Sequence, residues 1–355
     1  MSYVRLSGVT KKFGNVTAVS NLNLDIKKGE SFSMLGPSGC GKTTTLRMIA
    51  GFEDLDEGEI FVGDRLLSSR KKGYYLPPEK RNFGMVFQAF AIWPHMSVYE
   101  NVAFPLRLKK LTATEVEKRT INALAHTNLL DNARISPMDL SGGGKQRVAL
   151  ARALAINPDV MLLDEPLSSL DPHLREEMRF EIKDLQKEFG FSVIYVTHDQ
   201  SEAMALSDRI MVMKNGVVQQ VDSPMKVYHE PVNRFVFSFI GLSNFIDAYV
   251  LDGLVKVGAG EFIKYSMPPG HETIKDGKVT LATRPSEINF ISEGGVPGVV
   301  RRKAFLGEMI DYSVDVEGTE IRIQKGRRFP GPKEGEICHM DFLHPHWYEP
   351  EDASF

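Results

Sequence analysis

Apolar residues in the first 235 positions form short runs that alternate with helix-like patterns. This alternation is typical of an α/β domain with a largely parallel core sheet. Core strands are predicted at residues 31–35, 82–87, 160–163, 192–197 and 209–214. Shorter runs at residues 4–6, 21–26 and 59–62, set off by Lys-Gly and Gly-Asp turn signals, predict an antiparallel β subdomain beside that sheet.

A helical subdomain is predicted inside this domain, at about residues 88–157. Thr112 begins the pattern TATEVEKRTINALAHTN, and Glu115 follows three residues later. Thr followed by Glu at this spacing is the signature of a capping box at the start of an amphipathic helix.

The pattern changes after residue 235 to short alternating runs separated by Gly and Pro turns. Strands are predicted at residues 278–282, 298–303, 309–316 and 336–342. Short strands of this kind indicate a small, barrel-like all-β unit. We therefore expect an α/β domain at residues 1–235 and a β-rich domain at residues 236–355.

Composition narrows the class of protein. A chain of 355 residues is expected to hold more than one unit, and its net charge of -3 with 42% hydrophobic residues argues against disorder and against a polybasic nucleic-acid surface. No stretch approaches the roughly 20 apolar residues of a spanning helix, and the N-terminus lacks the apolar region of a signal peptide. Cys40 and Cys338 need not pair in a chain of this size, so a reducing cytosol is expected.

A phosphate-binding loop is the first candidate site. The pattern G-x-x-x-x-G-K-[ST] is fitted by Gly36, Pro37, Ser38, Gly39, Cys40, Gly41, Lys42 and Thr43. It follows an apolar run and opens a helical pattern, so backbone N–H groups and a helix N-terminus can face phosphate oxygens. Lys42 is expected to reach the β and γ phosphates of ATP and to take part in catalysis, and Thr43, followed by Thr44, to offer a hydroxyl to Mg²⁺.

Two acidic residues, Asp164 and Glu165, end the apolar run VMLL. The carboxyl end of a parallel strand lies beside such a phosphate loop. Asp164 is therefore a candidate Mg²⁺ ligand, and Glu165 a candidate base that orients and deprotonates water. An acidic pair alone is more often a turn or a helix cap, but the phosphate loop favours the catalytic interpretation.

A second anion-binding helix start is predicted at Ser141, which opens the pattern SGGGKQRVALARALAIN. Leu140 to Arg147 resembles the signature motif of ABC ATPases, and further segments stand in the order of that family. These are Phe13, similar to the aromatic that stacks on adenine, Gln88, similar to the Q-loop glutamine, Ser169-Leu170-Asp171, similar to the D-loop, and His198, similar to the switch histidine. Alone, Phe13 would be an ordinary core aromatic, Gln88 a surface amide and His198 a strand-end histidine.

The resemblance implies a P-loop ATPase fold with a RecA-like core and a dimer in which the signature of one subunit completes the phosphate loop of the other. The second subunit would be another copy of this chain or a homologous ATPase. Ser141, Gly143 and Asp171 are then expected at the partner's nucleotide. Gln88 is expected at Mg²⁺ and, with His198, among the catalytic and nucleotide-binding residues. One departure is Gly144, where family members usually carry glutamine.

Membrane partners follow from the same resemblance. It implies integral-membrane permease subunits and, indirectly, a substrate-binding protein, with this chain peripheral on the cytoplasmic side of the inner membrane. The apolar segment at residues 89–96 resembles the family surface that receives a permease helix, although ordinary core of the helical subdomain is the alternative. The chain is thus expected to hydrolyse ATP for an importer and to bind no nucleic acid.

The segment from residue 236 resembles the accessory TOBE domain of importer ATPases for sugars, polyamines, ferric iron and anions. Similar motifs are Arg284 to Ile288, Ala304 to Gly307 and Tyr312 to Val314. Its OB-like architecture suggests oligonucleotide binding, but only Arg327-Arg328-Phe329 joins basic and aromatic residues, so dimer bracing or regulation is the preferred interpretation. Polyamine or ferric iron is favoured as the solute over sugars.

Two alternatives stay open. One is a soluble ABC ATPase that acts on DNA or ribosomes, although those relatives generally carry two cassettes or a long coiled coil. The other is a regulatory ATPase whose β domain senses a small ligand.

Overall fold

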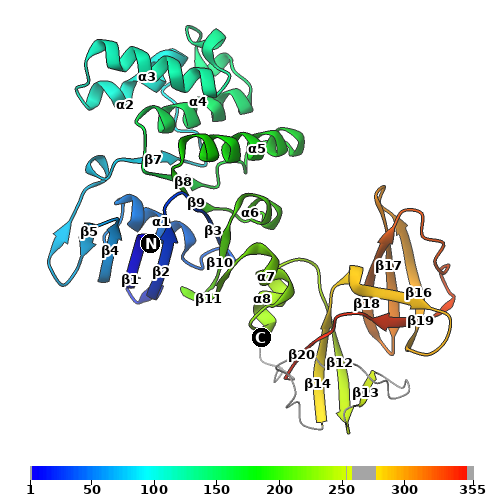
Figure 1. The fold of residues 1–355 in the computed structure, drawn as a ribbon. Coiled ribbons are helices and arrows are strands. Elements are labelled where there is room, and N and C mark those ends of the chain that lie inside the picture. Colours follow the sequence, from blue (N-terminus) through cyan, green and yellow to red (C-terminus); the bar gives the residue numbers. More distant parts are fainter. Residues whose placement is uncertain (1, 253, 258–276, 350–355) are drawn as a thin grey trace. The chain divides into compact units, whose positions relative to one another are not determined.

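The computed structural model describes residues 2–252, 254–257 and 277–349 (Figure 1). The chain divides into two compact units, Met1–Val232 and Asn233–Phe355. Among the described residues, no helix is both long enough and apolar enough to cross a bilayer.

The core sheet of the first unit has six strands in the order β11-β10-β3-β9-β8-β7. Their bounds are β3 (Ser31–Leu35), β7 (Phe83–Val86), β8 (Val160–Asp164), β9 (Ser192–Val196), β10 (Arg209–Lys214) and β11 (Val217–Asp222). All neighbours are parallel except β10 and β11. Every residue of β3 and β9 is buried, and strands buried on both faces read as the continuous apolar runs that the sequence shows.

An antiparallel sheet lies beside this core, in the order β2-β1-β4-β5-β6. Its strands are β1 (Ser2–Phe13), β2 (Val16–Lys27), β4 (Glu57–Val62), β5 (Arg65–Ser69) and β6 (Tyr74–Tyr75), and the short helix η1 (Pro78–Lys80) follows. One apolar cluster joins side chains of this sheet, of β3 and of helix α1 (Lys42–Ala50). The cluster holds the β1–β2 hairpin against the part of the core that carries the phosphate loop.

Helices α2 (Val98–Leu108), α3 (Ala113–His126) and α4 (Gly142–Ala155) form a group on the β7 side of the core sheet (Figure 1). The short helices η2 (Leu130–Asn132) and η3 (Pro137–Asp139) connect α3 to α4, and α5 (Pro172–Phe189) and α6 (Gln200–Leu206) flank the sheet. Alanines and leucines of α4 pack with α2, α3 and α5 in a second apolar cluster. Helix α7 (Pro224–His229) ends the unit.

Only one of the two hydrogen bonds of the capping box predicted for α3 is present, so the prediction is half wrong. The Thr112 hydroxyl accepts from the Glu115 backbone N–H at 3.3 Å, but the Glu115 carboxylate binds Nε of Arg119 at 2.5 Å. A complete box lies at α2 instead, where Ser97 and Glu100 bond each other's backbone N–H groups. Arg119 lies one helical turn after Glu115, and its ion pair with the Glu115 carboxylate replaces the bond from that carboxylate to the Thr112 backbone N–H.

In its described residues the second unit is all-β apart from the short helices α8 (Arg234–Phe239) and η4 (Pro285–Glu287). One sheet has the order β13-β12-β14-β20, with β12 (Asn244–Leu251), β13 (Leu254–Val257), β14 (Gly277–Thr283) and β20 (His346–Tyr348). The other has the order β15-β19-β16-β17-β18, with β15 (Ile288–Ile291), β16 (Val296–Phe305), β17 (Met309–Val316), β18 (Thr319–Gly326) and β19 (Ile337–Phe342). A single apolar cluster lies between them, which confirms the predicted fold class.

Candidate nucleotide site

Strand register brings the candidate residues to one edge of the core sheet. Met34 of β3 and Asp164 of β8 both pair with Val196 of β9, and Val86 of β7 pairs with Leu163 of β8. These strands are parallel, so the loops that follow them leave the sheet side by side. Those loops contain the phosphate loop, the acidic pair, the switch histidine and the Q-loop glutamine.

The phosphate loop has a backbone that three glycines permit. Gly36, Gly39 and Gly41 have φ values of 154°, 78° and 106°, where residues with a Cβ are strained. A Cβ on Gly36 would lie 2.4 Å from the carbonyl oxygen of Met213, and one on Gly41 would lie 2.4 Å from that of Ala18. The loop is therefore wedged between β10 and β2.

Exposure divides the loop into a tip and a base. Pro37, Ser38 and Gly39 are exposed, whereas Cys40, Gly41 and Lys42 are buried and Thr43 and Thr44 are half-buried. The tip thus faces solvent, where a phosphate chain can enter.

Lys42 lies at the centre of the loop. Its Nζ donates to the carbonyl oxygens of Gly36 at 2.7 Å and Pro37 at 3.0 Å, and Cys40 Sγ is 3.7 Å away. Backbone carbonyls orient the ammonium but leave its charge unneutralised. That charge is available to phosphate oxygens.

Thr43 and Asp164 supply neighbouring oxygen atoms, with Oγ1 of Thr43 3.5 Å from Oδ1 of Asp164. The pKa of Asp164 is raised, mainly by burial. The positive charge of Arg47 lowers the pKa in part, and the negative charge of Glu165 raises it further. A carboxylate that is costly to ionise without a partner is suited to a bound cation. Hydroxyl and carboxylate oxygens are ligands that Mg²⁺ prefers, so these residues fit a magnesium ion.

Three of the four predicted catalytic residues meet at one atom. Nε2 of Gln88 donates to Oε2 of Glu165 at 3.1 Å, and Nδ1 of His198 lies 3.4 Å from the same oxygen. Glu165 has a left-handed φ of 47°, and its backbone N–H donates to the carbonyl of Val196 at 2.9 Å. This turn aims the carboxylate across the strand ends toward Gln88 and His198.

A buried network behind His198 was not predicted. The Glu202 carboxylate accepts from Thr197 and Tyr195, each at 2.7 Å, and Arg175 lies near it with Nε 3.7 Å from Oε1. Arg175 also donates to the carbonyl of Leu170 at 3.0 Å. The Leu170 contact connects the D-loop to the loop that carries the histidine. In the sequence, only the spacing Asp199-x-x-Glu202 could have pointed to this network, and that spacing is typical of an ordinary helix cap.

The predicted signature residues form a separate cluster. Ser141 caps α4, and a Cβ on Gly143 would lie 2.7 Å from Cδ2 of Leu174, so the helix start packs closely on α5. Asp171 caps α5 by accepting from the Leu174 N–H at 3.1 Å. No hydrogen bond found within the described part of the chain joins this cluster to the phosphate loop.

Phe13, the predicted adenine contact, ends β1 and is 48% exposed. The Lys11 ammonium lies 5.1 Å from its ring centroid. Phe13 pairs with Val16 across the hairpin, and the carbonyl of Ala18 farther along β2 is the atom that confines Gly41. An exposed ring on this hairpin is not core packing, and it is available for stacking.

An apolar cavity of about 240 Å³ adjoins the loop after Gln88. Its walls include Phe87 just before Gln88, Ala91 and Trp93 of the loop, Pro105 of α2, and Arg152 and Ala153 of α4. The predicted apolar segment at residues 89–96 therefore contributes side chains to an open surface as well as to the core.

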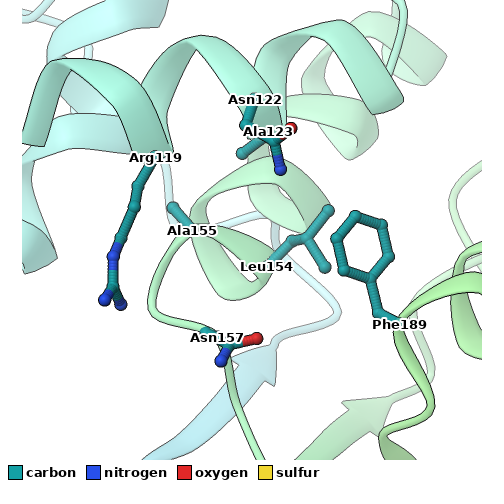
Figure 2. A pocket seen from close by; sticks show the side chains of 7 residues that line it. All are labelled: Arg119, Asn122, Ala123, Leu154, Ala155, Asn157 and Phe189. Carbon is teal, nitrogen blue, oxygen red and sulfur yellow. The ribbon is translucent and has the colours of Figure 1, made fainter. Parts of the chain in front are cut away.

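A further cavity of about 220 Å³ lies at the far end of α4 (Figure 2). Figure 2 shows Leu154 and the ring of Phe189 side by side, with Asn122 of α3 on one side and Asn157 after α4 on the other. None of its lining residues belongs to a nucleotide motif, so it is distinct from the candidate site.

Residues 19–168 match the ABC transporter family. The trehalose/maltose import ATP-binding protein MalK of Thermococcus litoralis is 48% identical over 296 residues, which cover 81% of this chain and 79% of that protein. This chain belongs to the ABC transporter family. The spermidine/putrescine import ATP-binding protein PotA of Acetivibrio thermocellus is 43% identical to this ABC ATPase over 348 residues, 95% of this chain and 94% of its own.

Solved structures of ABC ATPases have the same fold as part of this chain. The structure of cbiO1 from Clostridium perfringens, part of the ABC transporter complex cbiONQ, has a TM-score of 0.59 at 31% identity and covers 65% of this chain and 92% of its own. The ATP-binding cassette MJ0796, in a dimeric post-hydrolysis state with ADP and Pi, has a TM-score of 0.54 at 36% identity, covering 62% and 98%. The chain is thus an importer-type ABC ATPase subunit that binds and hydrolyses ATP.

Proposed function

We propose that this ABC ATPase works as a homodimer on the cytoplasmic face of the inner membrane and drives solute uptake through separate permease subunits. The observation that carries the proposal is the meeting of Gln88 and His198 at one oxygen of Glu165, beside the phosphate loop. The names of the relatives MalK and PotA favour a sugar-like or polyamine solute over ferric iron. A substrate-binding protein would deliver that solute to the permease.

Hydrolysis follows from the geometry. The Glu165 carboxylate accepts a proton from a water molecule, the water oxygen attacks the γ-phosphorus of ATP, and ADP leaves with the bridging oxygen. Gln88 and His198 hold the carboxylate oxygen that takes the proton. Lys42 binds the β and γ phosphates, and Thr43, Asp164 and Gln88 would hold Mg²⁺, which neutralises phosphate charge.

Dimerisation gives the signature cluster its role. The start of α4 at Ser141 and Gly143 presents backbone N–H groups and a partial positive charge to an anion. We assign them, with Asp171, to the nucleotide held by the partner copy. ATP bound between two copies stabilises the closed dimer, and hydrolysis removes that stabilisation.

Permease docking is assigned to the cavity beside Trp93 and Pro105. Its apolar walls fit the apolar face of a short helix, and its loop begins next to Gln88. A helix seated there would therefore act directly on the residue that contacts the base. This adjacency offers a route by which permease movement and ATP hydrolysis control each other.

The C-terminal unit is assigned to dimer bracing or regulation, as a TOBE-like domain at about residues 236–355. Buried Arg284, in its first motif, donates to the carbonyls of Phe237 and Leu242 and so ties α8 to the sheet. Phe329 of the basic-aromatic segment stacks on Phe290, with ring centroids 5.9 Å apart, and is not a free platform for bases.

Membrane fractionation tests the proposal in cells. The tagged chain should sediment with membranes, be extracted by detergent together with the permease, and become soluble when the permease genes are deleted. Lys42→Ala is the matched control, since it should impair hydrolysis but leave docking intact. A chain that stays soluble in permease-containing cells would support a soluble ATPase instead, and uptake of labelled spermidine or maltose would identify the solute class.

A further inference from the structure

Arg152 of α4 is a buried cation whose partners are backbone atoms. Its side chain belongs to a residue only 8% exposed, and it donates to the carbonyl of Ala91 at 2.5 Å and to that of Phe90 at 2.9 Å. The guanidinium carbon lies 4.8 Å from the ring centroid of Trp93. Within the described residues no carboxylate forms an ion pair with Arg152, and burial lowers its pKa. The loop at residues 90–93 therefore holds this cation.

The loop at this contact has a conformation that its residues do not favour. Phe90 and Ala91 have φ values of 56° and 49°, two consecutive left-handed residues that both carry a Cβ. Their carbonyls are the two that Arg152 binds. Removing the guanidinium would leave both carbonyls without this donor and the left-handed pair without its support.

A second buried side chain fixes the far end of the loop. Asn101 of α2 is fully buried, accepts from the Trp93 N–H at 2.9 Å and donates to the carbonyls of Trp93 and Met96. At the near end only Ala89 separates Gln88 from the Arg152 contact. The position of the Gln88 amide, 3.1 Å from Glu165, thus depends on a loop held from α4 and α2.

We propose that Arg152 is a positioning residue for hydrolysis, holding residues 90 and 91 left-handed so that Gln88 reaches Glu165. The inference rests on the proposed role of Gln88 and extends it. Arg152 lies on α4, the helix that Ser141 caps. In the proposed dimer, the start of this helix contacts the partner's nucleotide, and Arg152 farther along the same helix contacts the loop at residues 90–93. A tilt of α4 on dimer closure would move the Q-loop with it.

Purified full-length chain tests this with steady-state ATP hydrolysis. Arg152→Met should lower kcat by about tenfold to 10²-fold, because small displacements of positioning groups have effects of this size. The KM for ATP should stay within about twofold, since Arg152 is not among the residues assigned to nucleotide binding. Arg119→Met is the matched control. It removes a cation of the same subdomain that is paired with Glu115, and kcat should not change.

Glycine rescue separates positioning from general stability. Phe90→Gly with Ala91→Gly should restore most of the lost kcat in Arg152→Met, because glycine adopts positive φ without support. The same glycines should not raise Tm. If Arg152→Met proves poorly folded, Arg152→Lys, which keeps the charge but not the two-pronged donor, should give an intermediate kcat.

The outcomes are distinct. Unchanged kcat in Arg152→Met, with activity lost in Gln88→Ala, would overturn the inference and leave the proposed site standing. Lost kcat that glycine does not restore, together with a lowered Tm, would make Arg152 merely structural and also overturn it. Full activity of Gln88→Ala would instead remove the proposed role of Gln88 itself.

Discussion

Nδ1 of His198 lies 3.4 Å from Oε2 of Glu165, although the two residues come from different strand ends of the core sheet. The same oxygen accepts from Gln88, so the flanking side chains orient the carboxylate, which stays partly exposed and accessible to a water molecule that it can deprotonate. A proton acceptor held by neighbours on two sides can serve as a base without first being ordered.

Glu165→Gln is expected to lower ATP turnover by roughly 10² to 10⁴, because it keeps the size and polarity of the side chain but removes the base. Nucleotide binding should survive, since Lys42 and the phosphate loop are untouched. Phosphate release and equilibrium binding would measure the two effects. An ATP-bound dimer should accumulate on size-exclusion chromatography, and near-normal turnover would show that another group takes the proton.

Asp164→Asn should separate stability from function. Burial raises the pKa of Asp164 above its ordinary value of 3.8, so the folded chain binds this proton more tightly than the unfolded chain does. Above the raised pKa the ionised carboxylate destabilises the fold, and this cost disappears as the pH falls toward 3.8. Magnesium-free Asp164→Asn should therefore be the more stable protein at pH 7.

Tm should rise, and each 1 kcal/mol of stability gained corresponds to roughly 2–4 °C in a unit of this size. Calorimetry at pH 7 and at pH 4 checks the sign, since the difference should shrink at the lower pH. Mg²⁺-dependent ATP binding should be lost in the same variant. A destabilised Asp164→Asn at pH 7 would contradict the burial argument.

Cys40 should be the thiol whose modification stops hydrolysis. Its sulfur lies 3.7 Å from Nζ of Lys42, so an adduct would displace the ammonium that binds phosphate. Cys40 is only 3% exposed, and a maleimide should therefore react slowly and only when the loop opens. MgATP, by covering the loop, should slow inactivation further.

Cys338 should contribute nothing to this loss. It is 6% exposed, and burial raises its pKa to about 11, which leaves it as an unreactive thiol near neutral pH. Cys40→Ser should be resistant to the reagent, while Cys338→Ser should behave as the unmodified protein does. Inactivation that persists in Cys40→Ser would exclude this explanation.

Contiguous patterns were the predictable part of the molecule. The strand at Val160–Asp164 is a continuous apolar run because it is buried in a parallel sheet, and the acidic pair could be placed because it ends that run. The cap at Thr112 was only half predictable, since Arg119 captures the Glu115 carboxylate. The spacing of residues in the sequence does not show which of two polar partners a side chain will bind.

Contacts to distant backbone could not be predicted. Arg152 binds carbonyls 61 and 62 residues away, and every residue offers a carbonyl, so no residue type marks the partner. Arg175 binds the carbonyl of Leu170, only five residues away, and there too a carbonyl partner is not marked by any residue type. Helix periodicity places both arginines on a helix but does not indicate which loop they support.

Gly144 is the position where this chain departs from the usual signature, and the structure defines what it lacks. It is the third residue of α4, its N–H donates to the Ser141 hydroxyl at 3.3 Å, and it is not among the residues with positive φ. Glutamine at this position of a helix would complete a capping box by reaching back to the Ser141 N–H. Glycine supplies neither that bond nor the restricted backbone of other residues.

Two effects oppose each other in Gly144→Gln. Glycine costs a helix about 0.8 to 1.0 kcal/mol relative to alanine, and the reciprocal cap adds to the gain from replacing it. Against this, a Cβ at residue 144 would lie 2.9 Å from Cβ of Leu140, which must shift. Leu140 has extended backbone and donates its N–H to the Pro137 carbonyl at 3.3 Å, so its shift would load the end of η3 and not the hydrogen bonds within α4. We therefore expect the stabilising effects to prevail.

ATP-dependent dimerisation in the Glu165→Gln background measures the balance, because hydrolysis no longer disperses the complex. Gly144→Gln should tighten the dimer by a few-fold, since 1.4 kcal/mol is tenfold and only part of the helix gain can appear in the association constant. Gly144→Ala, which has the backbone restriction without the reach-back bond, should tighten it less. If both variants weaken the dimer and Leu140→Ala restores it, the contact with Leu140 outweighs the cap. In that case the third glycine is required by the packing of this helix start.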